Sequence, residues 1–240
     1  MAYAHRSDLR TAPPAPAPAS LAWQRRLLAA CIILAPLSIT LYIFAWPENP
    51  APVVVDSTTA APIVTSAMAG PTGNTLHFIG AVAASFFLPL GYLGMSLLGM
   101  RRAPGLATVA AALSLIGWIP WSALIGIDAL AHDIAMAGST PELAGLWTRF
   151  NGDPVMVTYL LIYVVGHLLS AVLIGIMLGR LRLVPLWAAW AFALTSPLTM
   201  AYFATHAIDA RYALRYLICA LWIAGAAPAA RAMLAGRDPE

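Results

Sequence analysis

The sequence predicts an all-α fold: a polytopic membrane bundle of six transmembrane helices with both termini in the cytoplasm. Three observations predict it, namely an apolar composition, six apolar stretches of membrane-spanning length, and arginines that gather on one side of the resulting topology. Of the 240 residues, 61% are hydrophobic and only 10% are charged, and the mean hydropathy is +0.79. These values are typical of a chain that lies in a lipid bilayer.

The six spans are separated by short turns or polar segments. A run of about 20 apolar residues crosses roughly 30 Å of hydrocarbon as a helix. We expect a six-helix membrane domain over residues 27–231, with spans at about 27–46, 76–100, 105–131, 154–179, 184–206 and 212–230.

The segments outside the spans are polar or rich in proline. Residues 1–26 contain TAPPAPAPAS, which has nothing to bury, so we expect a disordered cytoplasmic tail there and a second cytoplasmic tail at 232–240. The stretch 47–75 lacks a 20-residue apolar window and is expected to form an outer loop. A cleaved signal peptide is the competing interpretation of the first span. The apolar run exceeds the usual length for one, and no small-residue cleavage site follows closely.

A short interfacial helix is expected between the third and fourth spans. Ser139 or Thr140 would cap it, and Pro141 would occupy its first turn. Its apolar residues would lie on one side, as in helices at a membrane surface.

Small residues and prolines mark the places where spans approach closely or bend. Gly80, Ala84, Gly91 and Gly94 in the second span favour close helix packing. Prolines interrupt four of the spans, at Pro36, Pro89, Pro120 and Pro197.

The arginines predict the orientation, because cytoplasmic loops carry the excess of positive residues. The chain has no Lys, and its 13 arginines divide ten against three between the two sides. The expected cytoplasmic side has Arg6, Arg10, Arg25, Arg26, Arg101, Arg102, Arg180, Arg182, Arg231 and Arg237, and the outer side has Arg149, Arg211 and Arg215. Both ends should therefore lie on the cytoplasmic side of the plasma (inner) membrane. The bias toward Ala, Arg and Pro suits a GC-rich bacterial genome.

Ionisable residues gather at the expected outer ends of the spans. Asp128 and His132 are four residues apart and share one face at the end of the third span. The topology brings His77, His206 and Asp209 to the same level. This predicts an outward-facing His/Asp pocket that binds a small ligand or a metal ion. The alternative is that these groups lie in the hydrated head-group region, where a charged side chain costs little free energy, and that they bind nothing.

His167 lies near mid-membrane in its span. It has 13 residues before it and 13 after it between Pro154 and Arg180. A polar residue at that depth is a candidate functional group or haem ligand. The alternative is a structural role, in which a neutral imidazole forms a hydrogen bond that holds its helix to a neighbouring one. Ser170 shares its face, and Gly166 leaves room for another helix or a flat ligand.

Trp118 and Trp121 are the aromatic residues of interest. Both lie centrally in the third span and flank Pro120, so they either pack against other helices, as aromatic side chains usually do, or line a cavity.

The motifs for specific chemistry are absent, and no cofactor is identified. Zinc needs three or four converging ligands, and there is no HExxH or CxxC spacing. A single b-type haem would need His167 and a second imidazole. The alternatives to ligand binding are thus a single-haem redox protein, a membrane-embedded zinc hydrolase, and a structural subunit beside other membrane proteins. Nucleic-acid binding gains no support, because the arginines form no cluster. Cys31 and Cys219 lie in apolar runs and are expected to behave as buried hydrophobic residues.

The order of elements along the chain is one helix, a long outer segment, a Gly-rich helix opening with LHFIG and a late GHLLSAVLIG helix. It resembles that of uncharacterised bacterial six-helix integral membrane proteins over roughly residues 25–235. The resemblance is one of topology and composition, and it implies no functional residue.

Overall fold

The computed structural model describes residues 19–47, 61–205 and 207–236, and its regular structure there is entirely helical. The helices are α1 (Ala19–Ala45), α2 (Ala61–Leu97), α3 (Pro104–Trp118), α4 (Trp121–Ala137), α5 (Pro141–Asn151), α6 (Pro154–Arg180), α7 (Leu186–Ala204) and α8 (Ile208–Ala235). The prediction of an all-α fold is therefore confirmed for the described residues.

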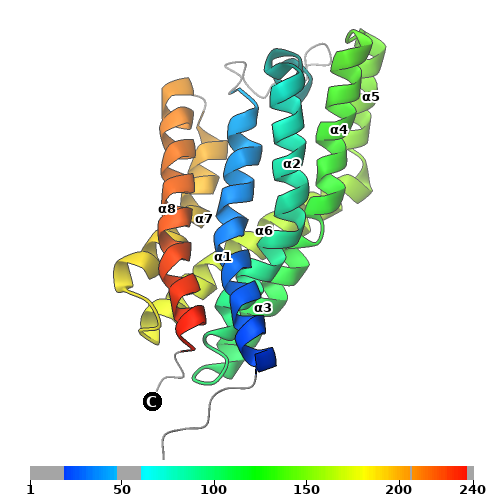
Figure 1. Ribbon diagram of the computed structural model, residues 1–240. Coiled ribbons are helices and arrows are strands. Elements are labelled where there is room, and N and C mark those ends of the chain that lie inside the picture. The colour runs from blue at the N-terminus through cyan, green and yellow to red at the C-terminus, as the bar shows by residue number, and fades with distance from the viewer. Residues whose placement is uncertain (1–18, 48–60, 206, 237–240) are drawn as a thin grey trace, which may run out of the picture.

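The long helices pack in a closed ring. Helix α1 packs between α2 and α8, and α2 packs against α3 and α4. Helix α6 lies against α3 and α7, and α7 lies against α8, which closes the ring. The first turn of α1 and the last turn of α8 lie at the same end of the bundle (Figure 1).

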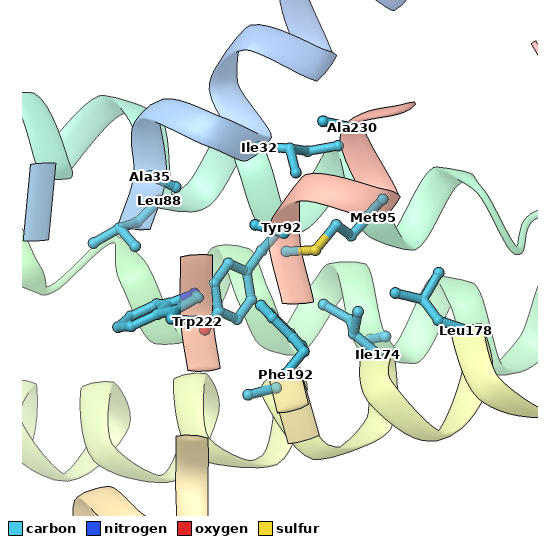
Figure 2. Packing of buried hydrophobic residues seen from close by; sticks show 14 of the residues in the cluster. Ile32, Ala35, Leu88, Tyr92, Met95, Ile174, Leu178, Phe192, Trp222 and Ala230 are labelled. Atoms are coloured by element: carbon cyan, nitrogen blue, oxygen red, sulfur yellow. The ribbon is translucent and has the colours of Figure 1, made fainter. Parts of the chain in front are cut away.

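Large buried side chains from several helices pack together inside the ring (Figure 2). Tyr92 of α2 lies at its centre, with its ring centroid 5.2 Å from that of Phe192 and 6.1 Å from that of Trp222. The outer surface is also apolar, since Phe86 and Leu161 are 63% and 59% exposed. Apolar side chains on both sides of the helices are expected when the bundle is surrounded by lipid.

Five stretches of the described chain are helical, long and apolar enough to cross a membrane: α1, α2, α3 together with α4, α6 and α8. They coincide with five of the six expected spans. Helix α7, at the expected span 184–206, is not among them. Its sequence includes Trp187, Trp190, Thr195 and Ser196, which lower the apolar character of a short helix.

Several boundaries differ from those expected. Residues 19–26, expected in the disordered tail, belong to α1, and residues 61–75, expected in the outer loop, belong to α2. Helix α2 is bent at Gly70, whose φ of 63° and ψ of −177° are not helical. The local sequence reveals the first turns of α2 poorly, because buried polar contacts such as those of Ser66 and Asn74 hold them in place rather than an apolar run. The rest of the expected tails, 1–18 and 237–240, lies outside the described residues.

Proline interrupts the spans less than expected. Helices α1, α2 and α7 continue through Pro36, Pro89 and Pro197, whereas Pro120 does separate α3 from α4. Membrane helices tolerate proline where other groups satisfy the freed carbonyl.

The expected short helix is present as α5. Thr140 caps it, since its side chain accepts a hydrogen bond from the Leu143 amide at 3.4 Å. Trp147 ties α5 to α4 by donating from Nε1 to the Ile127 carbonyl at 3.0 Å.

Candidate functional site

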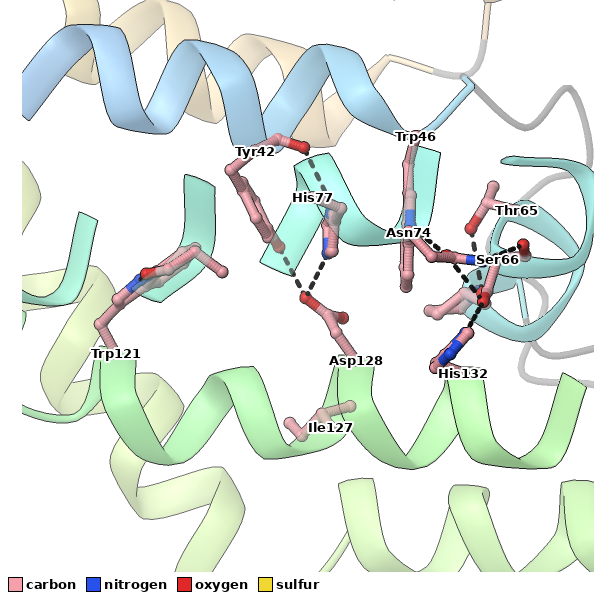
Figure 3. Close-up of polar contacts among 12 residues, drawn as sticks. Tyr42, Trp46, Thr65, Ser66, Asn74, His77, Trp121, Ile127, Asp128 and His132 are labelled. Carbon is pink, nitrogen blue, oxygen red and sulfur yellow. Dashed lines mark hydrogen bonds and ion pairs between the residues drawn. The ribbon is translucent and has the colours of Figure 1, made fainter. Parts of the chain in front are cut away.

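Three helices bring together Tyr42, His77 and Asp128 (Figure 3). The Tyr42 hydroxyl donates to Asp128 Oδ2 at 2.8 Å, and His77 Nε2 lies 3.3 Å from the same oxygen. His77 Nδ1 donates to the Tyr42 carbonyl at 2.9 Å. The imidazole is 3% exposed and the carboxylate 16% exposed, so both lie largely inside the bundle.

Close packing of α1 on α2 makes this arrangement possible. Gly80 lies one turn after His77 on the same face of α2 and faces α1. A Cβ atom at Gly80 would lie 2.9 Å from the Ser38 carbonyl oxygen and 2.8 Å from Tyr42 Cα, both backbone atoms of α1. The absence of a side chain therefore lets α1 approach until the Tyr42 carbonyl reaches the His77 ring. The close approach expected at this glycine is confirmed.

Trp46 connects this site to a second set of polar side chains. Its indole stacks on the His77 ring with centroids 3.7 Å apart and planes 5° apart, and its Nε1 donates to Asn74 Oδ1 at 2.8 Å. Ser66 Oγ lies 3.0 Å from Asn74 Oδ1 and 3.0 Å from His132 Nδ1. Together these contacts fix the bent start of α2 against α1 and α4 (Figure 3).

The sequence-predicted site residues thus converge only in part. His77 and Asp128 are in contact, whereas His132 points to Ser66, one helical turn beyond Asp128. Asp209 is exposed in the first turn of α8, and His206 lies outside the described residues. Among the residues that the structure describes, no three His, Cys, Asp or Glu side chains come together as a metal ion would require.

A cavity of about 360 Å³ opens beside Asp128, inside the ring of helices. We call it the central cavity. Its walls are largely apolar, and seven of the helices contribute aromatic side chains to them: Tyr42, Tyr92, Trp118, Trp121, Tyr163, Tyr202, Phe203 and Trp222. Asp128 and His167, which the sequence singles out for different reasons, both line this cavity. Trp118 and Trp121 line the cavity and also belong to the buried hydrophobic core, so both interpretations of these residues apply.

His167 is held in the cavity wall by its own helix and by α3. Its Nδ1 donates to the Tyr163 carbonyl at 2.5 Å, and its ring stacks on Tyr163 at 4.2 Å and lies 4.9 Å from Trp118. The two helices touch at Gly166 and Gly117, where a Cβ on Gly166 would lie 2.5 Å from Gly117 Cα. The room expected beside His167 is thus filled by another helix.

The haem hypothesis requires a second imidazole for this cavity. In the described part of the chain, His77 and His132 are engaged at the junction of α1, α2 and α4, so His167 is the imidazole offered to the cavity. The haem hypothesis, in which His167 pairs with another histidine, stays a prediction.

Arg215 is a functional candidate that sequence reasoning overlooked. The residue is 6% exposed and lines the cavity. Its Nη2 donates to the Trp46 carbonyl at 2.9 Å and to the Ile43 carbonyl, and its guanidinium lies over the Phe44 ring at 4.5 Å. The charge therefore faces the carbonyl end of α1, where a cation is favourable. In the sequence it is simply one of the outer arginines.

Two tryptophans in the cavity wall have buried indole N–H groups that make no hydrogen bond to the described residues. Trp118 and Trp222 are 1% and 7% exposed, and neither indole nitrogen has a hydrogen-bond partner among the described residues. A buried donor without an acceptor is costly, and a bound molecule is one way to supply the acceptor.

Comparison with protein-family models, with curated proteins and with solved structures gives no match for this chain.

Proposed function

We propose that this chain is a six-span protein of the bacterial plasma membrane, with both termini cytoplasmic, that binds a small and largely apolar molecule in the central cavity. The five apolar helices make it a multi-pass membrane protein. Helix α7 completes the ring between α6 and α8, which supports a sixth crossing. The ten-to-three distribution of arginines supports the orientation.

The observation that carries the ligand-binding proposal is a cavity with unsatisfied polar atoms in an apolar wall. Its volume of about 360 Å³ falls in the range of about 300–1,000 Å³ found for small-molecule sites. Apolar and aromatic walls with a few polar groups are typical of such sites. Here the polar groups include the indole donors of Trp118 and Trp222 and the carboxylate of Asp128. They would orient a ligand that the aromatic rings hold.

The crossing of α7 is tested by labelling single cysteines at its two ends. Arg182→Cys and Asp209→Cys are made in a chain whose Cys31 and Cys219 are replaced by Ala. A membrane-impermeant maleimide is expected to label Asp209→Cys in intact cells and Arg182→Cys only after permeabilisation. Labelling of both from the same side would show that α7 does not cross.

Ligand binding is tested with two probes of the same shape: 2-phenylethyl-trimethylammonium, and its uncharged carbon isostere (3,3-dimethylbutyl)benzene. Tryptophans line the cavity, so binding to the purified full chain is followed by intrinsic fluorescence. We expect saturable binding of at least one probe. If neither probe binds saturably, the proposal is wrong.

A cavity-filling variant provides the specificity control. Ala171 is 2% exposed and lines the cavity, so Ala171→Phe should abolish probe binding. Val165 is on the same helix but 54% exposed on the outer surface, so Val165→Phe should bind as the parent does. Equal binding by the two variants would place the probe outside the cavity.

A further inference from the structure

The hydrogen bonds of His77 require one extra proton in the contact with Asp128. A carbonyl oxygen only accepts, so the nitrogen that faces the Tyr42 carbonyl, Nδ1, carries a hydrogen. In a neutral ring, Nε2 then bears a lone pair, and it lies 3.3 Å from an Asp128 oxygen that already accepts from the Tyr42 hydroxyl. Two acceptors facing each other repel. The contact is favourable when one of the two atoms holds a proton, so His77 and Asp128 share one proton and together carry no net charge.

Loss of this proton leaves the His77–Asp128 pair with a charge of −1. A carboxylate without a counter-ion in contact with it is costly in an apolar interior. The charge would lie at the edge of the central cavity, because Asp128 is one of the lining residues. Asp128 Oδ2 takes both contacts, and Oδ1 has no hydrogen-bond partner among the described residues. A cation that enters the cavity would therefore find a free carboxylate oxygen.

The walls of the cavity favour an organic cation over a metal ion. Aromatic faces attract diffuse positive charge such as that of a substituted ammonium group, particularly where water is excluded. Tyr42, which bonds Asp128, begins a row of rings that continues with Trp121 and Tyr163, with centroids 5.0 Å apart for the first two and 5.4 Å for the last two. A metal ion would need at least three ligands, and the described residues bring together no such group.

Further charged or titratable groups line the cavity, and among them Arg215 carries a full positive charge. Arg215 of α8 directs its guanidinium to carbonyls at the end of α1. His167 of α6 is fixed by the Tyr163 carbonyl. The phenols of Tyr92, Tyr163 and Tyr202 on α2, α6 and α7 are uncharged at neutral pH.

We propose that the central cavity binds a hydrophobic organic cation at Asp128 in exchange for the proton that Asp128 shares with His77. The exchange is balanced: one monovalent cation enters, one proton leaves for solvent, and the net charge of the site stays the same. This inference rests on the proposed function, of which it specifies the ligand class.

The test is calorimetric titration of the full chain with 2-phenylethyl-trimethylammonium, in two buffers of different ionisation enthalpy and between about pH 6 and pH 8. We expect close to one proton released per cation bound. Affinity should rise about tenfold per pH unit for as long as the pair holds its proton, because proton and cation compete one to one. Cation binding without proton release or pH dependence would overturn the exchange.

Asp128→Asn is the decisive variant, with Asp133→Asn on the exposed side of the same helix as its matched control. Asp128→Asn should remove the preference for the cation over its uncharged isostere, whereas Asp133→Asn should keep it. Retained binding of the isostere shows that the variant is folded. If the parent protein binds only the isostere, the cation proposal fails and the proposed function stands. If it binds neither probe, both fail.

Discussion

Replacing Gly166 by Ala adds a single methyl group at the place where α6 touches α3. That methyl carbon would lie 2.5 Å from Gly117 Cα, 2.8 Å from Gly117 N and 3.1 Å from the Leu113 carbonyl oxygen. Carbon atoms attract one another best at about 3.5–4.0 Å. All three neighbours are backbone atoms, so a side-chain rotation cannot relieve the overlap, and the two helices must separate by about 1 Å.

Overpacking of this kind costs about 1–3 kcal/mol, which lowers the ratio of folded to unfolded protein about 5- to 150-fold. The added methyl also favours the helix by about 0.5–1 kcal/mol relative to glycine. Gly126→Ala is the control for this gain, because nothing lies within 4 Å of a Cβ at Gly126 of α4. The difference in unfolding free energy between the two variants therefore isolates the contact between the helices.

The assay is reversible unfolding in mixed micelles with increasing dodecyl sulfate, followed by circular dichroism. We expect Gly166→Ala to unfold at a lower fraction of dodecyl sulfate than the parent, and Gly126→Ala at the same or a higher fraction. Because the contact also holds Trp118 beside His167, Gly166→Ala should change the tryptophan emission spectrum before unfolding begins. Equal stability of the two variants would refute the close packing of α3 on α6.

Three further predictions use the same unfolding assay. Gly80→Ala should destabilise the protein by about 1–3 kcal/mol, because its Cβ would meet the backbone of α1; stability equal to that of the parent would contradict this packing. Trp147→Phe should cost about 0.5–1.5 kcal/mol, since it removes the indole donor to the Ile127 carbonyl, and should speed proteolysis within α5 but not within α6. Arg215→Met keeps an unbranched side chain but removes its hydrogen bonds to carbonyls of α1, and we expect a loss of about 1.5–3 kcal/mol; no loss would mean that these bonds do not hold α8 to α1.

The sequence predicts the helices well, because a span must be apolar for about 20 residues whatever its neighbours are. The span of residues 154–179 agrees with α6, Pro154–Arg180, to within one residue. The boundaries that differ are those that neighbouring helices decide. Ser66 and Asn74 are polar and lie in a segment without an apolar run, yet they are helical and buried because they bond each other and His132.

From the sequence, only the depth of the site in the membrane could be predicted, near the outer ends of the spans. Asp128 and His77 were both expected at the outer ends of their spans, and they do meet. Which helix faces meet depends on close approaches such as that at Gly80, and one sequence does not reveal these. Tyr42 and Trp222 gave no signal, because a tyrosine or tryptophan in a span is as readily a packing residue as part of a cavity.

The most direct test of a ligand site in the central cavity is to locate a bound probe by anomalous diffraction. The full chain would be crystallised with 2-(4-bromophenyl)ethyl-trimethylammonium and the bromine position measured. We expect a bromine peak inside the ring of helices, bordered by Trp118 and Tyr163, with the ammonium group toward Asp128. Bromine found only on the outer, lipid-facing surface of the helices would contradict it.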